Sequence, residues 1–230
     1  MTLFRRSVIA AVAAAMTVAA PAFAQDAKPA ETTPAPAQAQ AQAAADQMPE
    51  GKVLADIVLG KAEAPLTIVE YASFTCPHCA AFHAENLPKL KAEYIDTGKV
   101  KFIQRDVYFD AVGLWAGILA RCGGDDKYYA VSDMLFDEQK TWLDAKTGDE
   151  IAANLRKIGA KAGMTTEQMD ACWADKQKVA DLVTTFQKNA TADNVEGTPS
   201  FVIGGEKVQN QPWDDMKKII DAKLAAAGAK

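Results

Sequence analysis

Residues 69–83 read VEYASFTCPHCAAFH, and this stretch decides how the rest of the chain is interpreted. Cys76 and Cys79 flank Pro77 and His78, directly after an apolar, β-rich run. Apolar residues then recur at helical spacing, which predicts that the pair lies where a buried strand meets a helix. The spacing places both sulfurs on one side of the first helical turn, where a disulfide can close. Such a pair is a metal site, a structural bridge or a reactive dithiol.

The N-terminal residues indicate the compartment. Arg5 and Arg6, an apolar run over residues 8–20 and the small residues Ala22 and Ala24 are typical of a secretory signal peptide. We therefore expect residues 1–24 to be a cleaved signal peptide, with an uncleaved anchor as the alternative. The run is short for a membrane span. Export brings the four cysteines into an oxidising space, where thiols pair or react.

Composition limits the kinds of partner. The formal net charge of -5 provides no electrostatic basis for binding nucleic acid. Residues 25–50 consist mainly of Ala, Gln and Pro with few large apolar side chains. Burial cannot offset the entropy of ordering such a segment, so it is predicted to be a flexible linker. The remainder suffices for one well-cored domain with an insertion.

Periodicity predicts the order of the elements. Strands are expected at 56–60, 66–74 and 99–108, and a strand hairpin at 200–209. Helices are expected at 80–95, with a kink at Pro88, in several pieces over 110–189, and from Pro212 onward. A βαβ unit followed by a hairpin predicts an α/β fold with a mixed sheet covered by helices. We expect this domain at 51–110 and 190–230, with a helical insertion at 111–189.

The position of the dithiol predicts that it is reactive. Free amides and the dipole at a helix N-terminus favour an anion, so the pKa of Cys76 should fall. His78 can add a hydrogen bond or positive charge. A stable thiolate stabilises the reduced form and makes the disulfide oxidising, with Cys76 as attacked sulfur and Cys79 as resolving thiol. A zinc site with His83 would lack a fourth ligand, and a structural bridge over so short a loop stabilises little.

The tetrad CPHC after a strand, with GTPSFVI at residues 197–203, resembles the DsbA family of thioredoxin-fold thiol oxidases. The resemblance covers roughly residues 56–227 and implies a thioredoxin fold with an inserted helical domain, no cofactor and no metal. It also implies that Pro199 is cis beside the dithiol and turns the backbone of Thr198 outward to pair with an extended substrate. An ordinary trans proline is the alternative.

Glu70 lies on the strand before the dithiol, on the same face as Ile68 and Ala72. An ionised carboxylate on a buried face is costly, and an edge-exposed glutamate is the alternative. The family has an acid at the matching position, which implies that Glu70 shuttles the proton of Cys79. His83 is expected on the helix surface.

Cys122 and Cys172 both fall in the predicted helical insertion. Bridged to each other, they would close a loop of about fifty residues, which the chain-entropy model values at about 4 kcal/mol. Some members of the family carry such a bridge and others do not. Two separate buried thiols, or a regulatory redox pair, are the alternatives.

The favoured interpretation is a periplasmic thiol:disulfide oxidoreductase that donates its Cys76–Cys79 disulfide to reduced secreted or envelope proteins. The resemblance implies reoxidation by a quinone-linked inner-membrane partner, and we expect a monomer. A disulfide isomerase or reductase with the same dithiol is the alternative that Thr198 before the proline favours, although residues 25–50 offer no dimerisation segment. A non-catalytic module that binds a metal or a client is the third interpretation.

Overall fold

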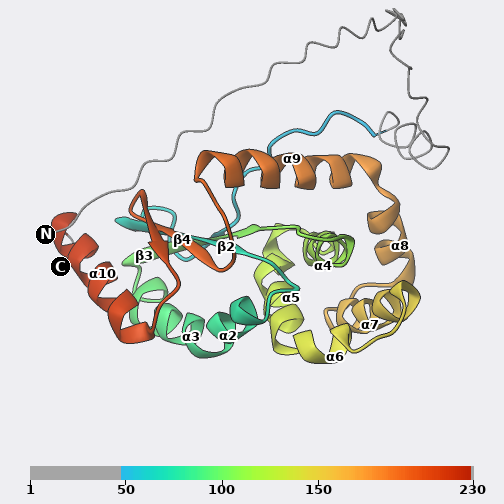
Figure 1. Cartoon of the computed structure of the whole chain (residues 1–230), viewed down its shortest axis with the longest axis horizontal. Coiled ribbons are helices and arrows are strands. Elements are labelled where there is room, and N and C mark those ends of the chain that lie inside the picture. The colour runs from blue at the N-terminus through green and yellow to red at the C-terminus, as the bar shows by residue number, and fades with distance from the viewer. Residues whose placement is uncertain (1–47, 229–230) are drawn as a thin grey trace, which may run out of the picture. The chain divides into compact units, whose positions relative to one another are not determined.

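The computed structural model describes residues 48–228, which Figure 1 draws in colour. The expected signal peptide at 1–24 and nearly all of the expected linker at 25–50 lie outside the described residues. Within the described part, no helix is both long enough and apolar enough to cross a bilayer.

A five-stranded sheet forms the centre of the fold. Its strands are β1 (Val58–Leu59), β2 (Leu66–Ala72), β3 (Val100–Asp106), β4 (Ser200–Ile203) and β5 (Glu206–Gln209). Their order is β1-β3-β2-β4-β5. β2 and β3 are parallel, and the other neighbours are antiparallel. The predicted mixed sheet is therefore confirmed, and β2 is central.

Helices cover both faces of the sheet, as Figure 1 shows. On one face, Ile68 and Phe102 pack with Phe82 and Leu90, and with the last helix, α10 (Trp213–Ala226), through Ile220. On the other face, side chains of β2 and β3 pack against α9 (Lys176–Ala192). Successive residues of a strand point to opposite faces, so a strand covered on both sides reads as a continuous apolar run.

The helix after the dithiol is divided into three pieces. They are α2 (Pro77–Glu85), α3 (Leu87–Leu90) and a π-helical turn, η1 (Lys91–Ile95). The break at Asn86 falls beside Pro88, whose ring cannot donate a hydrogen bond and clashes with the preceding turn. The predicted kink is thus an interruption of the helix, two residues earlier than the proline.

The helical insertion forms its own core beside the sheet. Its helices are α4 (Ala111–Cys122), α5 (Asp125–Asp137), α6 (Gln139–Leu143), α7 (Gly148–Lys161), α8 (Thr166–Ala174) and the long α9. Leu119, Leu135 and Trp142 are fully buried in this core. The same cluster includes Phe74 and Cys79, so the insertion packs directly against the dithiol segment.

The chain enters the domain along α9. The amide of Lys52 donates to Asp181 and the amide of Leu54 donates to Thr185, each at 2.9 Å. At Gly51 a side chain would meet the backbone of Ala180, so close approach to the helix requires glycine here. The segment after residue 50 is therefore held along α9 before β1 begins.

Candidate active site

The two cysteines lie at the edge of the sheet where β2 ends. Cys76 is the N-cap residue of α2 and Pro77 is its first helical residue, which suits a proline because that position needs no amide donor. Both thiols are free. Cys76 is half-buried and Cys79 is fully buried. The sulfur of Cys76 is therefore the one that another molecule can reach, and Cys79 is inaccessible to solvent.

The surroundings stabilise the Cys76 thiolate. A hydrogen bond from the Cys79 thiol is the largest cause that lowers the pKa of Cys76 from 9.0 to about 5. Burial opposes this shift, while a side-chain hydrogen bond from Thr198 and the backbone amides of Cys79 and His78 add to it. His78 thus acts through its amide. Its imidazole is exposed and makes no hydrogen bond to another described residue.

Cys79 is held as a thiol by the same arrangement. The hydrogen bond that Cys79 makes to Cys76 is the largest cause of its raised pKa. Burial of the thiol and the negative charge of Glu70 raise the pKa further. The pKa values of the two cysteines therefore move in opposite directions. At neutral pH Cys76 is therefore a thiolate that accepts a hydrogen bond from the thiol of Cys79.

The loop before β4 contributes the other side of the site. The Thr198–Pro199 peptide bond is cis, and Pro199 is buried. The carbonyl oxygen of Thr198 lies 3.3 Å from the sulfur of Cys76 and accepts from it when it is a thiol. This contact favours the protonated form, so it opposes the hydrogen bonds that favour the thiolate.

Glu70 and His83 form a buried pair beneath the dithiol. Nε2 of His83 lies 2.9 Å from Oε2 of Glu70, and their side chains are 2% and 0% exposed. The edge-exposed alternative for Glu70 is wrong. The expectation of a surface position for His83 is also wrong, because α2 turns this residue toward β2 and its ring stacks on Phe136 of α5 at 3.9 Å.

Two further residues shape the cysteine loop and carry no motif in the sequence. The side-chain amide of Gln139 is buried and donates to the carbonyl oxygens of Phe74 at 2.8 Å and Cys76 at 3.0 Å. Asp110 caps α4 through the amide of Gly113 at 2.7 Å and accepts from the hydroxyl of Thr75 at 3.2 Å. The helical insertion therefore fixes the loop in which Cys76 sits.

Cys122 and Cys172 form a disulfide that joins α4 to α8. The bridge closes a separation of 50 residues within the insertion and lies among Ile118, Leu182 and other apolar side chains. No part of it enters the dithiol site. Of the alternatives for these two cysteines, the structure contains the bridged form.

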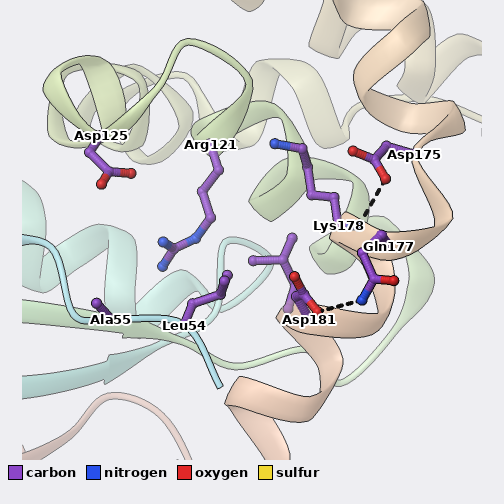
Figure 2. A pocket seen from close by; sticks show the side chains of 9 residues that line it. Leu54, Ala55, Arg121, Asp125, Asp175, Gln177, Lys178 and Asp181 are labelled. Carbon is purple, nitrogen blue, oxygen red and sulfur yellow. Dashed lines mark hydrogen bonds between the residues drawn. The ribbon is translucent and has the colours of Figure 1, made fainter. Parts of the chain in front are cut away.

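A cavity of about 320 Å³ lies elsewhere, between the entering chain, α4 and α9. Figure 2 shows Arg121 and Lys178 lining it together with Asp125, Asp175 and Asp181. Its charges nearly balance, and it holds neither cysteine of the dithiol. Among residues 48–228, no three His, Cys, Asp or Glu side chains are grouped as metal ligands would be.

Comparison with known proteins places this architecture in a family. A thioredoxin family model matches residues 52–222. A putative protein-disulfide oxidoreductase from Rickettsia bellii is 32% identical over 170 residues, which cover 74% of this chain and 64% of the relative. The chain thus spans a little under two thirds of that relative's length.

Solved structures agree. Wolbachia pipientis alpha-DsbA1 matches with a TM-score of 0.69 and 26% identity, covering 77% of this chain and 94% of that one. A protein-disulfide isomerase from Novosphingobium aromaticivorans matches with a TM-score of 0.68 and 26% identity, covering 74% and 99%. The fold and the dithiol define a thioredoxin-fold protein. Within that class, the chain belongs to the DsbA family.

Proposed function

We propose that this chain is a periplasmic thiol:disulfide oxidoreductase that donates its Cys76–Cys79 disulfide to reduced secreted or envelope proteins. The observation that carries the proposal is the position of Cys76 at the N-terminus of α2 beside the buried thiol of Cys79, which lowers the pKa of Cys76 to about 5 and raises that of Cys79. A thiolate of low pKa is a good leaving group, and its stability favours the reduced form of the pair. The disulfide is therefore expected to accept electrons readily.

The transfer proceeds in two exchanges. A client thiolate attacks the sulfur of Cys76, the Cys76–Cys79 bond breaks, and its electron pair goes to Cys79, which takes up one proton. The second client thiolate then attacks the client sulfur of the mixed disulfide, and Cys76 leaves as a thiolate. The client loses two electrons and two protons, and the protein gains two electrons and one proton. The other proton goes to solution.

The loop at Thr198 and Pro199 supports binding of an extended client. Thr198 lies beside Cys76, two residues before β4 begins at Ser200. A client backbone can pair with Thr198 while its cysteine is joined to Cys76. The predicted signal peptide at 1–24 supports the periplasmic location. The proposal includes reoxidation of the dithiol by a quinone-linked inner-membrane partner. It also includes a monomeric state of the protein.

A disulfide isomerase is the second candidate. Two observations favour it: the threonine before Pro199, and the likeness to the isomerase from Novosphingobium aromaticivorans. An isomerase must form mixed disulfides and also release them without net oxidation. Its dithiol is therefore expected to be less oxidising than that of a disulfide donor.

Redox equilibrium with glutathione separates the two candidates. A disulfide donor should stay largely reduced even at high ratios of oxidised to reduced glutathione, and should oxidise a reduced, unfolded client. Refolding of a client with scrambled disulfides provides the second readout. A weakly oxidising couple together with rapid unscrambling would reject the donor in favour of the isomerase.

A non-catalytic module is tested by Cys76→Ser. Loss of client oxidation in this variant, with the fold retained, is expected for an oxidoreductase. Full activity in cells, or stoichiometric metal in the purified protein, would instead support a module that binds a client or a metal.

A further inference from the structure

The buried pair of Glu70 and His83 leaves two polar atoms without a partner. Oε1 of Glu70 and Nδ1 of His83 make no hydrogen bond to any described residue, although both are buried. Buried polar atoms in folded proteins are nearly always paired, so each exception calls for an explanation. The pair therefore has one free acceptor on the side of Glu70 and one free ring nitrogen on the side of His83.

The free ring nitrogen of His83 lies near a carboxylate of a neighbouring helix. Nδ1 lies 4.0 Å from Oδ1 of Asp133 on α5, whose side chain is 57% exposed. Stacking on Phe136 fixes the plane of the imidazole. The side chain of Asp133 is free to rotate toward Nδ1, since solvent surrounds more than half of it. His83 thus lies between a carboxylate inside the fold and a carboxylate at its surface.

The proposed reaction needs such a connection. Cys79 is 0% exposed and must gain one proton when its bond to Cys76 breaks, and must lose it again on reoxidation. Glu70 is near enough for its charge to act on Cys79. A fully buried carboxylate can pass a proton between Cys79 and solvent only through a neighbouring group that lies closer to the surface.

We propose that His83 is a positioning residue that holds Glu70 beneath Cys79 and relays the proton between Glu70 and Asp133. This inference rests on the proposed disulfide transfer. Asp137 of the same helix and Lys91 of η1 act on the charge of Asp133, and the charge of Glu70 also acts on Tyr129 of α5.

Each proton that one nitrogen of His83 gives up is matched by a proton that its other nitrogen takes up. In the reductive direction, the ionised Glu70 takes a proton from Nε2 of His83 and passes it to Cys79, so Glu70 is again ionised at the end of the step. Nδ1 then takes one from Asp133, which is reprotonated by water. The imidazole gains and loses one proton and no electrons. On reoxidation the same steps run in reverse, and the proton leaves through Asp133.

The test is the rate at which a cysteine-pair peptide reduces the oxidised protein, followed by stopped flow in H2O and D2O. The variants are His83→Gln, which cannot relay a proton, and Asp133→Asn at the surface. Asp137→Asn is the matched control, because it removes the same charge from α5 at a residue that is not paired with His83. General acid–base groups contribute large factors, so we expect His83→Gln to react about ten- to a hundredfold more slowly.

Two readouts distinguish a relay from a packing role. Asp133→Asn should be reduced by the peptide more slowly than Asp137→Asn. Its rate should rise with the buffer concentration, since buffer molecules can replace the missing surface carboxylate as proton donor. His83→Gln should show a larger solvent isotope effect while the thiolate titration of Cys76 stays near that of the wild type. Should His83→Gln fail to fold, the buffer response of Asp133→Asn decides alone.

Three outcomes would overturn the relay. They are wild-type rates in both variants, equal rates in Asp133→Asn and Asp137→Asn, or slow rates that respond neither to D2O nor to buffer. Failure of the wild-type protein to oxidise the peptide would instead reject the proposed function. The two failures are therefore distinguishable in one experiment.

Discussion

At the scale of single residues, Cys76 and Cys79 show how one hydrogen bond separates two chemically identical groups. The bond from Cys79 to Cys76 stabilises a thiolate on the first and a thiol on the second. Burial raises the pKa of both, but Cys76 also receives amides of the first turn of α2 and Cys79 does not. Position at the helix N-terminus alone does not account for the whole shift.

Cys79→Ala tests this hydrogen bond. Removal of the largest cause of the lowered pKa should move the pKa of Cys76 from about 5 back toward its ordinary value of 9.0. The ultraviolet absorbance of the thiolate, followed against pH, measures it. Cys76→Ser, which lacks this thiolate, is the control. A midpoint that stays near 5 in Cys79→Ala would mean that the backbone amides suffice.

Gln139→Leu tests the clamp on the cysteine loop. The substitution leaves the buried carbonyl of Phe74 without a donor, at a cost of about 1–3 kcal/mol, while the carbonyl of Cys76 still accepts from the amides of Cys79 and Ala80. We expect the free energy of unfolding to fall by about 1–3 kcal/mol in denaturant titrations. Lys140→Ala, an exposed neighbour, should change little. Equal stability of the two variants would contradict the clamp.

At the scale of elements, the helical insertion does two things. It packs against the dithiol segment through the cluster that contains Phe74 and Cys79, and it supplies Gln139 and Asp110 to the loop around Cys76. The insertion is itself closed by the bridge between α4 and α8. Its rigidity therefore bears on the geometry of the dithiol even though the bridge lies apart from it.

Removal of the bridge in Cys122→Ala/Cys172→Ala should lower the free energy of unfolding by about 4 kcal/mol, the value for a loop of this length in the chain-entropy model. Denaturant unfolding of the oxidised proteins measures it. Cys122→Ala alone should lose about as much, because one cysteine cannot form the bridge. The thiolate titration of Cys76 should not move. A loss below about 1 kcal/mol would show that the unfolded chain is already restricted.

At the scale of the whole molecule, three chain segments meet at one edge of the sheet. β2 and β3 are parallel, so the loops that follow them, carrying Cys76 and Asp110, lie at the same edge. β4 is antiparallel to β2, so the segment that precedes it, with Thr198 and Pro199, arrives there too. The site is thus assembled from parts of the chain more than a hundred residues apart.

The redox state should couple to global stability through pH. The pKa of Cys76 in the folded, reduced protein is about 5, below its ordinary value of 9.0. Ionisation therefore stabilises the folded reduced form. This contribution is complete above about pH 9 and is lost as the pH falls through about 5. The oxidised form has no thiol at this position and lacks the contribution.

We therefore expect the difference in Tm between the reduced and oxidised proteins to shift in favour of the reduced form as the pH rises from 5 toward 9. Thermal unfolding of both forms at several pH values measures it. The Tm of Cys76→Ser, which lacks this thiolate and cannot form the disulfide, should show no such rise relative to the oxidised wild type over the same pH range. A difference independent of pH in the wild type would contradict the coupling.

Local sequence sufficed for several features. The strand before Cys76, the helix after Cys79 and the hairpin around Gly204 and Gly205 follow from periodicity and turn residues, and each is present in the structure. Pro88 correctly indicated an interruption of the helix, although the break falls at Asn86. These signals are carried by neighbouring residues, so no tertiary information is needed to detect them.

His83 shows where that information ends. An isolated histidine at helical spacing reads equally well as a surface residue or a core residue, and only the packing of α2 on β2 and α5 decides that it pairs with Glu70. Gln139 is a similar case, because its partners lie 63 and 65 residues earlier in the chain. Neither residue belongs to a motif.

The class of fold and the place of the dithiol follow from the amino-acid sequence alone, because strand alternation, helix spacing and the Cys-Pro-His-Cys tetrad are local patterns. Which buried groups surround the two sulfurs depends on how distant segments pack together. Hydrogen bonds and charge interactions act over a few ångströms in space, and the segments that bring Thr198, Glu70 and Gln139 to the cysteines are neighbours only after folding.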